Sequence, residues 1–431
     1  MGIYGALQTA VTGMAAQSFA LENISGNIAN SQTTGYKRME TGFIDLIPDA
    51  AVGRQVPGAV LGYSRSTNDV RGDIVTSQTG THVALSGSGY FVVAQKSSTS
   101  DGQAIFNDTQ YFTRRGDFEL DREGYLVNGA GYYLMGVPVD RSTGNVSGSV
   151  PGEIKVDNGL LDPRATKKVN YQLNLPDEVG LLVAGVGDPE FVEQTIEGGA
   201  ITVYAENGAA ANVQLRWGKL ADTPDTWQLY YMSNADPETW AAVPDGEFEF
   251  DAGGTLVRQS ATAIGAGDAV SVDIAGLTVN GTTIGNVKFD FGAGGLTQYD
   301  NANGRASVSA LNQDGYPAGT LSSVAVNDSG RVVATYSNGK QIELYQIVTA
   351  NFNAENQLKR MDGGVYAATA ASGEAIFSLD AGMTGGALEM SNTDISEEFT
   401  KLIVTQQAYA AGTRIVSTSD EMLQEALNMV R

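Results

Sequence analysis

Residues 391–431 read SNTDISEEFTKLIVTQQAYAAGTRIVSTSDEMLQEALNMVR, and this stretch decides the architecture of the chain. Its apolar residues recur in alternating steps of four and three, the spacing of a helix that buries one seam against another helix. The predicted seam comprises Ile395, Phe399, Leu402, Tyr409, Val416, Leu423, Leu427 and Val430. Leaving such a row of side chains in water would forgo on the order of 10 kcal/mol, so the helix is predicted to need a partner.

The start of this helix is marked in the sequence. Asp394 is a suitable N-cap, Glu397 follows three positions later as in a capping box, and Glu397 and Glu398 place negative charge at the positive end of the helix dipole. Gly412 costs about 1 kcal/mol relative to Ala, so packing must order the helix. An amphipathic helix lying on its own globular domain would show the same stripe.

The first thirty residues carry the same spacing. Leu7, Met14, Leu21 and Ile28 fall on one heptad position. Two complementary seams at opposite ends of the chain predict that the terminal helices pair as a coiled coil, with the middle of the chain looped out between them. Further order is expected from packing between copies of the chain.

Composition excludes several classes of protein. The chain has 431 residues, with 26 Lys plus Arg against 49 Asp plus Glu, and its formal net charge of -23 argues against nucleic acid as a partner. The absence of Cys and the single His exclude disulfides and Cys/His zinc sites. No apolar run approaches the ~20 residues of a membrane span. The amino terminus lacks a basic patch followed by an apolar run, so we expect no cleaved signal peptide.

The middle of the chain is typical of short strands. Residues 82–93 predict two strands around a Gly-rich turn, residues 118–127 predict a hairpin, and residues 319–348 predict three strands with a type I′ turn at Asn338-Gly339. Residues 40–71 show no strong periodicity and predict an irregular connection. Residues 149–293 hold all three Trp and predict a separate β-sandwich or barrel.

The predicted fold class is therefore α+β and multidomain, with two nested, mostly β domains between the terminal helices. The predicted boundaries are 1–33 and 392–431 for the terminal helical core domain, 34–71 and 373–391 for connecting segments, 72–148 and 294–372 for a discontinuous inner domain, and 149–293 for an inserted outer domain.

No motif supports catalysis or a cofactor. Gly87-Ser88-Gly89 lacks the third Gly of a dinucleotide loop, and Gly339-Lys340 lacks the earlier Gly of a phosphate loop. His82 has Ser86 four residues on, but a catalytic triad also needs an orienting carboxylate and an oxyanion hole. We interpret His82 as structural and expect no enzymatic activity, no cofactor and no metal.

The stretch after the first predicted helix, residues 29–38, reads ANSQTTGYKR. Gly35 can end a helix in the left-handed conformation, and the basic pair after it would follow the negative helix end. The stretch resembles one near the amino terminus of bacterial flagellar rod and hook proteins, as do residues 391–409 and the block at 319–352. The residues that carry the amino-terminal resemblance are Ala29, Asn30, Thr33, Gly35, Tyr36, Lys37 and Arg38.

This resemblance implies a function. It implies a subunit of the flagellar hook, a flexible curved tube outside the cell that acts as a universal joint between motor and filament. It also implies export by the flagellar type III apparatus, and contacts with distal rod, hook-filament junction and hook cap proteins. No nucleic acid and no membrane insertion are expected.

Two alternatives stay open. A distal rod protein, a rigid drive shaft, belongs to the same family but is typically shorter and lacks the large inserted domain. A secreted β-rich binding module or adhesin with helical ends would need a ligand cleft lined by Trp217, Trp227 or Trp240.

Overall fold

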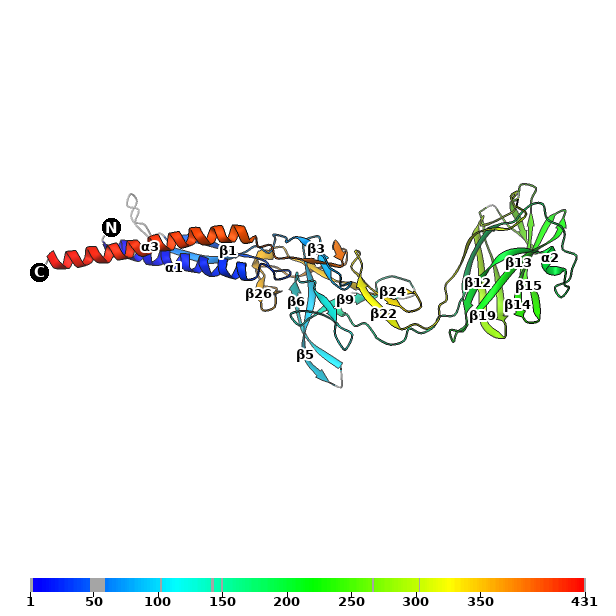
Figure 1. The fold of residues 1–431 in the computed structure, drawn as a ribbon, viewed down its shortest axis with the longest axis horizontal. Coiled ribbons are helices and arrows are strands. Elements are labelled where there is room, and N and C mark those ends of the chain that lie inside the picture. Colours follow the sequence, from blue (N-terminus) through cyan, green and yellow to red (C-terminus); the bar gives the residue numbers. More distant parts are fainter. Residues whose placement is uncertain are drawn as a thin grey trace. The chain divides into compact units, whose positions relative to one another are not determined.

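The computed structural model describes residues 3–46, 59–100, 103–140, 143–148, 150–265, 267–301 and 303–429 (Figure 1). Within these ranges the chain is mostly β, with three α-helices: α1 (Ile3–Ala29), α2 (Phe191–Gln194) and α3 (Ile395–Met429). Val430 of the predicted seam and residues 47–58 of the predicted connection lie outside the described residues.

The chain divides into two compact units. Unit 1 comprises Met1–Asn158, Ser322–Thr335 and Gln341–Arg431, and unit 2 comprises Gly159–Leu321 and Tyr336–Lys340. Unit 2 corresponds to the predicted outer domain, which the sequence analysis ended at residue 293. In the structure, residues 294–321 also belong to unit 2. The reason is a long-range pairing that composition does not reveal: β21 (Ser307–Gln313) pairs antiparallel with β11 (Lys168–Asn174).

Helices α1 and α3 of unit 1 lie side by side (Figure 1), which confirms that the two terminal helices meet within one chain. They run antiparallel, because Gly412 of α3 faces Met14 while Asn27 of α1 bonds to Glu398. The Asp394 carboxylate accepts from the backbone N–H groups of Ser396 and Glu397 at 2.8 and 3.2 Å, so the predicted N-cap is confirmed.

The expectation of an irregular connection after α1 is wrong. Strands β1 (Met39–Leu46) and β2 (Ala59–Ser66) form an antiparallel hairpin that packs on α1, where Gly62 approaches Ala16 and Phe19. The helix covers only part of the hairpin, and apolar side chains such as Phe43 stay exposed. A clean alternation of apolar and polar residues is therefore absent, and periodicity could not reveal the strands.

The sheet of unit 1 combines strands from both sides of the inserted unit 2. Among the described residues it has the strand order β22-β23-β24-β9-β5-β6-β27-β26, with shorter strands at its margins. The strands before the insertion are β3 (Ile74–Thr76), β4 (Val83–Leu85), β5 (Tyr90–Ser100), β6 (Gln103–Thr113), β7 (Phe118–Leu120), β8 (Leu126–Asn128), β9 (Tyr132–Pro138) and β10 (Gly152–Glu153). Those after it are β22 (Leu321–Val326), β23 (Arg331–Tyr336), β24 (Gln341–Ile347), β25 (Thr349–Asn351), β26 (Lys359–Met361), β27 (Val365–Ala367), β28 (Ile376–Ser378), β29 (Met383–Gly385) and β30 (Ala387–Glu389). Four of these strands lie outside this sheet, because β3 pairs with β30 and β4 pairs with β29 in separate two-stranded sheets.

The predicted hairpins form, with one correction. β7 pairs with β8, and β23 pairs with β24. At the second turn Gly339 has a φ of 76°, but Asn338 is not among the residues with positive φ, so the predicted type I′ turn is wrong. The Gly339 N–H donates to the Tyr336 carbonyl, as in a three-residue loop with Gly in the left-handed position.

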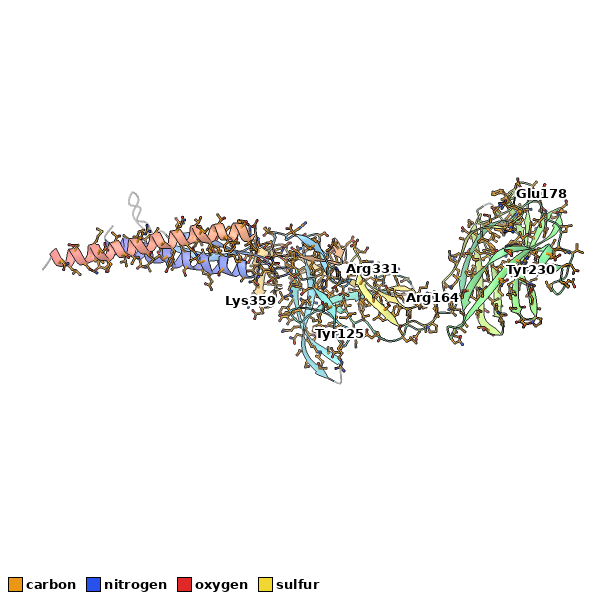
Figure 2. All side chains as sticks on the ribbon, viewed as in Figure 1. Tyr125, Arg164, Glu178, Tyr230, Arg331 and Lys359 are labelled. Carbon is orange, nitrogen blue, oxygen red and sulfur yellow. The ribbon has the colours of Figure 1, made fainter. Side chains whose placement is uncertain are left out.

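Unit 2 is a two-sheet β structure with a main core and a smaller apolar cluster beside α2. One sheet runs from β12 to β17 in sequence order, and the other has the order β18-β19-β11-β20 with β21 paired to β11. Its remaining strands are β12 (Ile196–Tyr204), β13 (Ala210–Asp222), β14 (Asp225–Ala235), β15 (Glu238–Phe250), β16 (Leu256–Gln259), β17 (Thr262–Ala263), β18 (Ala269–Val279), β19 (Thr282–Ala293) and β20 (Leu296–Thr297). Tyr230 of β14, labelled in Figure 2, packs edge-on against Phe191 of α2 with ring centroids 5.0 Å apart.

The three Trp residues lie in the interior of unit 2. Trp217 and Trp227 belong to its main core, and Trp240 belongs to a smaller cluster with Phe191, Tyr230 and Met232. Trp217 and Trp227 are fully buried, and Trp240 is 5% exposed beneath the Arg216 guanidinium. The Trp217 indole N–H donates to the Tyr171 hydroxyl at 2.9 Å, which donates to the Gly198 carbonyl at 2.6 Å. These side chains therefore line no ligand cleft, and the adhesin alternative lacks its distinguishing feature.

Gly412→Leu should separate the terminal helices. A Cβ at this position would lie 2.6 Å from the Met14 Cγ, and overpacking of this kind costs about 1–3 kcal/mol. Urea unfolding followed by helical ellipticity should therefore shift to lower urea. Gly26→Ala is the matched control, because its Cβ would meet nothing within 4 Å, and it should raise stability by roughly 0.5–1 kcal/mol. Equal effects of the two substitutions would contradict this packing.

Candidate assembly surface and helix junction

The intrachain contact of α3 is made by small and polar side chains. Glu398, Thr405 and Ser419 are buried, and Gly412 completes their seven-residue row. The facing residues of α1 include buried Ala10 and Ala20, and small side chains allow close approach of the helices. A search for large apolar residues misses this row, although its seven-residue spacing is visible in the sequence.

The predicted seam residues are covered to different degrees in the single chain, and Met14 faces Gly412 within the contact. On α1, Leu7, Met14, Leu21 and Ile28 are half-buried, and so are Leu402, Val416 and Leu423 on α3. Ile395, Phe399, Tyr409 and Leu427 remain 39–71% exposed. With Ile403, at 54% exposure, Ile395 and Phe399 form an apolar stripe at four-residue spacing, which we call the α3 stripe.

A groove lies on the other flank of α3, between α3, α1 and β1. Its volume is about 430 Å³, and its lining includes Ala20 and Ile24 of α1, Phe43 of β1 and Val404 of α3. The charged residues at this groove already have partners. Lys401 pairs with Glu397 at 2.8 Å and Glu398 at 2.9 Å, while Arg38 pairs with Glu397 at 2.9 Å and Glu40 at 3.2 Å. An apolar side chain of another molecule could therefore enter this groove without burying an unpaired charge.

Residues 29–38 build the junction between α1 and the sheet of unit 1. Ala29 is the last residue of α1, and the turn after it is held by Asn30, whose amide donates to the Gly26 carbonyl, and by Thr33, whose hydroxyl donates to Asn30 at 3.1 Å. Gly35 has the predicted left-handed backbone, with a φ of 66°, but it does not end the helix. Its role is close approach, because a Cβ there would lie 2.7 Å from the Arg114 carbonyl carbon.

Asn27 is a central residue of this junction that the sequence motif does not include. It is 1% exposed, and its amide donates to the Met39 carbonyl at 2.8 Å and to Glu398 at 3.0 Å. Its carbonyl oxygen accepts from the Met39 N–H at 2.8 Å and from the Tyr36 hydroxyl at 3.3 Å. One side chain thus joins α1, β1 and α3. The Tyr36 ring in turn lies 4.2 Å from the Arg360 guanidinium.

Lys37 and Arg38 have different environments, contrary to the expectation of one basic pair after a helix end. Arg38 pairs with Glu397 in the first turn of α3. Lys37 is 1% exposed, and its ammonium donates to Glu389 at 2.5 Å and to the Val70 carbonyl at 2.7 Å. Burial lowers the pKa of Lys37, and the Glu389 carboxylate opposes this shift. Arg114, 2% exposed, contacts the second oxygen of Glu389 at 3.2 Å.

The single His belongs to a turn. Its Nδ1 lies 2.8 Å from the Ser77 hydroxyl, which also accepts from the Thr79 N–H, while Ser86 bonds instead to Thr384. In the part of the chain that the structure describes, no group of three or more His, Asp or Glu residues could hold a metal ion. None of the described helices is long and apolar enough to cross a membrane.

Family models match four successive parts of the chain. The descriptions are "Flagella basal body rod protein" for residues 7–37, "Flagellar hook protein FlgE/F/G D1 domain" for 84–179, "Flagellar basal body protein FlaE D2 domain" for 188–316 and "Flagellar basal body rod FlgEFG protein C-terminal" for 384–429. The terminal helices and both units thus have the character of a bacterial flagellar rod or hook subunit.

Full-length relatives narrow this class. The flagellar hook protein FlgE of Escherichia coli is 30% identical over 98% of this chain and 100% of its own length. That of Brucella suis is 29% identical over 100% of both chains. The chain belongs to the flagellar hook protein FlgE family. A crystal structure of Helicobacter pylori flagellar hook protein FlgE2 aligns with 74% of this chain and 99% of its own, at 12% identity and a TM-score of 0.49.

Asn27→Asp should destabilise unit 1 in a pH-dependent way. The new carboxylate would lie beside buried Glu398, and two adjacent carboxylates raise the pKa of the pair. A raised pKa in the folded state makes the loss largest near neutral pH and smaller as the pH falls toward 5. Asn27→Ala, the control without added charge, also removes the two donated hydrogen bonds, and it removes the two accepted ones as well. Thermal unfolding of both variants between pH 5 and 8 should show an additional pH dependence only for Asn27→Asp; parallel profiles would contradict the assignment.

Proposed function

We propose that this chain is the structural subunit of a bacterial flagellar hook, and that copies of it polymerise into a flexible curved tube that transmits motor torque to the filament. The observation that carries the proposal is the match to hook proteins over their full length, together with apolar surface on the terminal helices. The terminal helices, 1–33 and 392–431, form the coiled-coil core of the tube, and the β-rich parts lie outside it.

The two flanks of α3 suit repeated addition of copies. Phe399 of the α3 stripe and Val404 of the groove are five positions apart, which places them about 140° apart around the helix and about 7.5 Å apart along its axis. A stripe and a groove on opposite flanks make a head-to-tail contact, and such contacts generate open helical assemblies. Leu402, Val416 and Leu423 of the predicted seam are half-buried in the single chain.

The remaining parts of the proposal follow from the family. The chain is exported through the flagellar type III apparatus without a cleaved signal peptide and functions outside the cell. Its neighbours are distal rod, hook-filament junction and hook cap proteins. Electron microscopy of the assembled protein tests the proposal: a curved tube is expected, a straight rigid rod would favour the distal rod alternative, and absence of polymer would contradict both.

Phe399→Glu should abolish polymer formation while unit 2 stays folded. The side chain is 48% exposed in the single chain, so the substitution removes no intrachain core, but it would place a charge in a contact between copies. Sedimentation and electron microscopy measure the polymer, and Trp fluorescence reports on unit 2. Gln407→Glu adds the same charge at another exposed position of α3 and is the matched control, which should still assemble. Normal tubes from Phe399→Glu would refute a role for the α3 stripe.

A further inference from the structure

Three buried charges in the junction do not balance. Lys37 and Arg114 are both cations and both come from the amino-terminal part of unit 1, whereas Glu389 comes from the carboxyl-terminal segment. All three side chains are at most 2% exposed. The next acid is Glu355, which accepts from the Tyr90 hydroxyl at 3.1 Å, and the Arg114 guanidinium lies 5.3 Å from the Tyr90 ring. Glu389 is therefore the direct ionic partner of both cations.

The backbone around Glu389 joins the same segments. Its carbonyl accepts from the Gly35 N–H at 2.7 Å, and its carboxylate also accepts from the Gly72 N–H at 3.0 Å. As the last residue of β30, it pairs with Ile74 of β3. Placing Glu389 thus fixes the segment after α1, the segment before β3 and, through Arg114, the end of β6.

Removing different members of this cluster has unequal consequences. Without Glu389, two like charges would be buried together with no anion in direct contact, and breaking a buried pair in this way is strongly destabilising. Without Lys37, the Arg114–Glu389 pair remains, with one cation for one carboxylate. Replacing a buried ion by an apolar side chain of similar volume is often close to neutral.

We propose that the junction can form only once the Glu389 carboxylate is in place. The amino-terminal segments cannot bury Lys37 and Arg114 until the carboxyl-terminal segment places the Glu389 carboxylate between them. The terminal helices and the sheet of unit 1 therefore fold as one cooperative unit only when both ends of the chain have come together. This buried charge cluster forms within a single subunit and does not depend on the polymer.

Urea unfolding of full-length variants tests this proposal with two probes. Helical ellipticity reports almost entirely on α1 and α3 of unit 1, and Trp fluorescence reports on unit 2, which holds every Trp. Glu389→Gln should lower the folding equilibrium constant of the helical transition roughly 100-fold or more. The decrease caused by Lys37→Met should be smaller by a factor of about ten or more. The Trp transition should not move. Glu374→Gln, at an exposed position, is the matched control and should leave both transitions unchanged.

The double variant Lys37→Met/Glu389→Gln decides the mechanism. Because it buries one uncompensated cation instead of two, it should be more stable than Glu389→Gln alone, and it should recover helical signal if the single variant does not fold. Hydrogen exchange of residues 34–38 and 67–76 should rise in Glu389→Gln and fall again in the double variant. A Glu389→Gln loss no larger than that of Lys37→Met, or a double variant less stable than Glu389→Gln, would overturn the proposal.

Discussion

One carboxylate, that of Glu389, neutralises two cations inside unit 1, and the position of the terminal helices relative to the inner sheet depends on it. A charge is buried only where a partner repays its desolvation, so the three side chains constrain one another more tightly than apolar contacts of the same size. Hydrogen bonds from Gly35 and Gly72 extend that constraint to the backbone. The junction therefore ties the segments next to α1 and α3 to each other through buried charge and backbone hydrogen bonds.

The helix pair divides its side chains by size. Small and polar residues, with Gly412 at the closest approach, face the other helix of the same chain, while large apolar residues such as Phe399 and Ile403 face outward. A helix stabilised only by its own chain would show the reverse arrangement, because burial of large side chains gives the larger gain in free energy. This distribution is consistent with the proposed polymer, in which neighbouring copies would cover the apolar surface.

Unit 2 has its own core, to which the terminal helices contribute no residue. Trp217, Tyr171 and Phe291 pack against one another between its two sheets, and the buried polar atoms of Trp217 and Tyr171 bond to each other. A separate core allows this unit to vary without disturbing the junction. The fold thus separates a part fixed by buried charge and helix contact from a part stabilised by its own aromatic core.

Sequence alone determined the terminal helices, the Asp394 cap, the β character of the middle and the family motif, because each depends on local spacing or on a few adjacent residues. It did not reveal the β1–β2 hairpin, the extent of unit 2 or the roles of Asn27 and Glu389. Those depend on partners far away in the chain: Asn27 bonds to Glu398, Lys37 pairs with Glu389, and β21 pairs with β11. Periodicity reports which face of an element is apolar, but only the tertiary structure decides which distant residue covers that face or neutralises a buried charge.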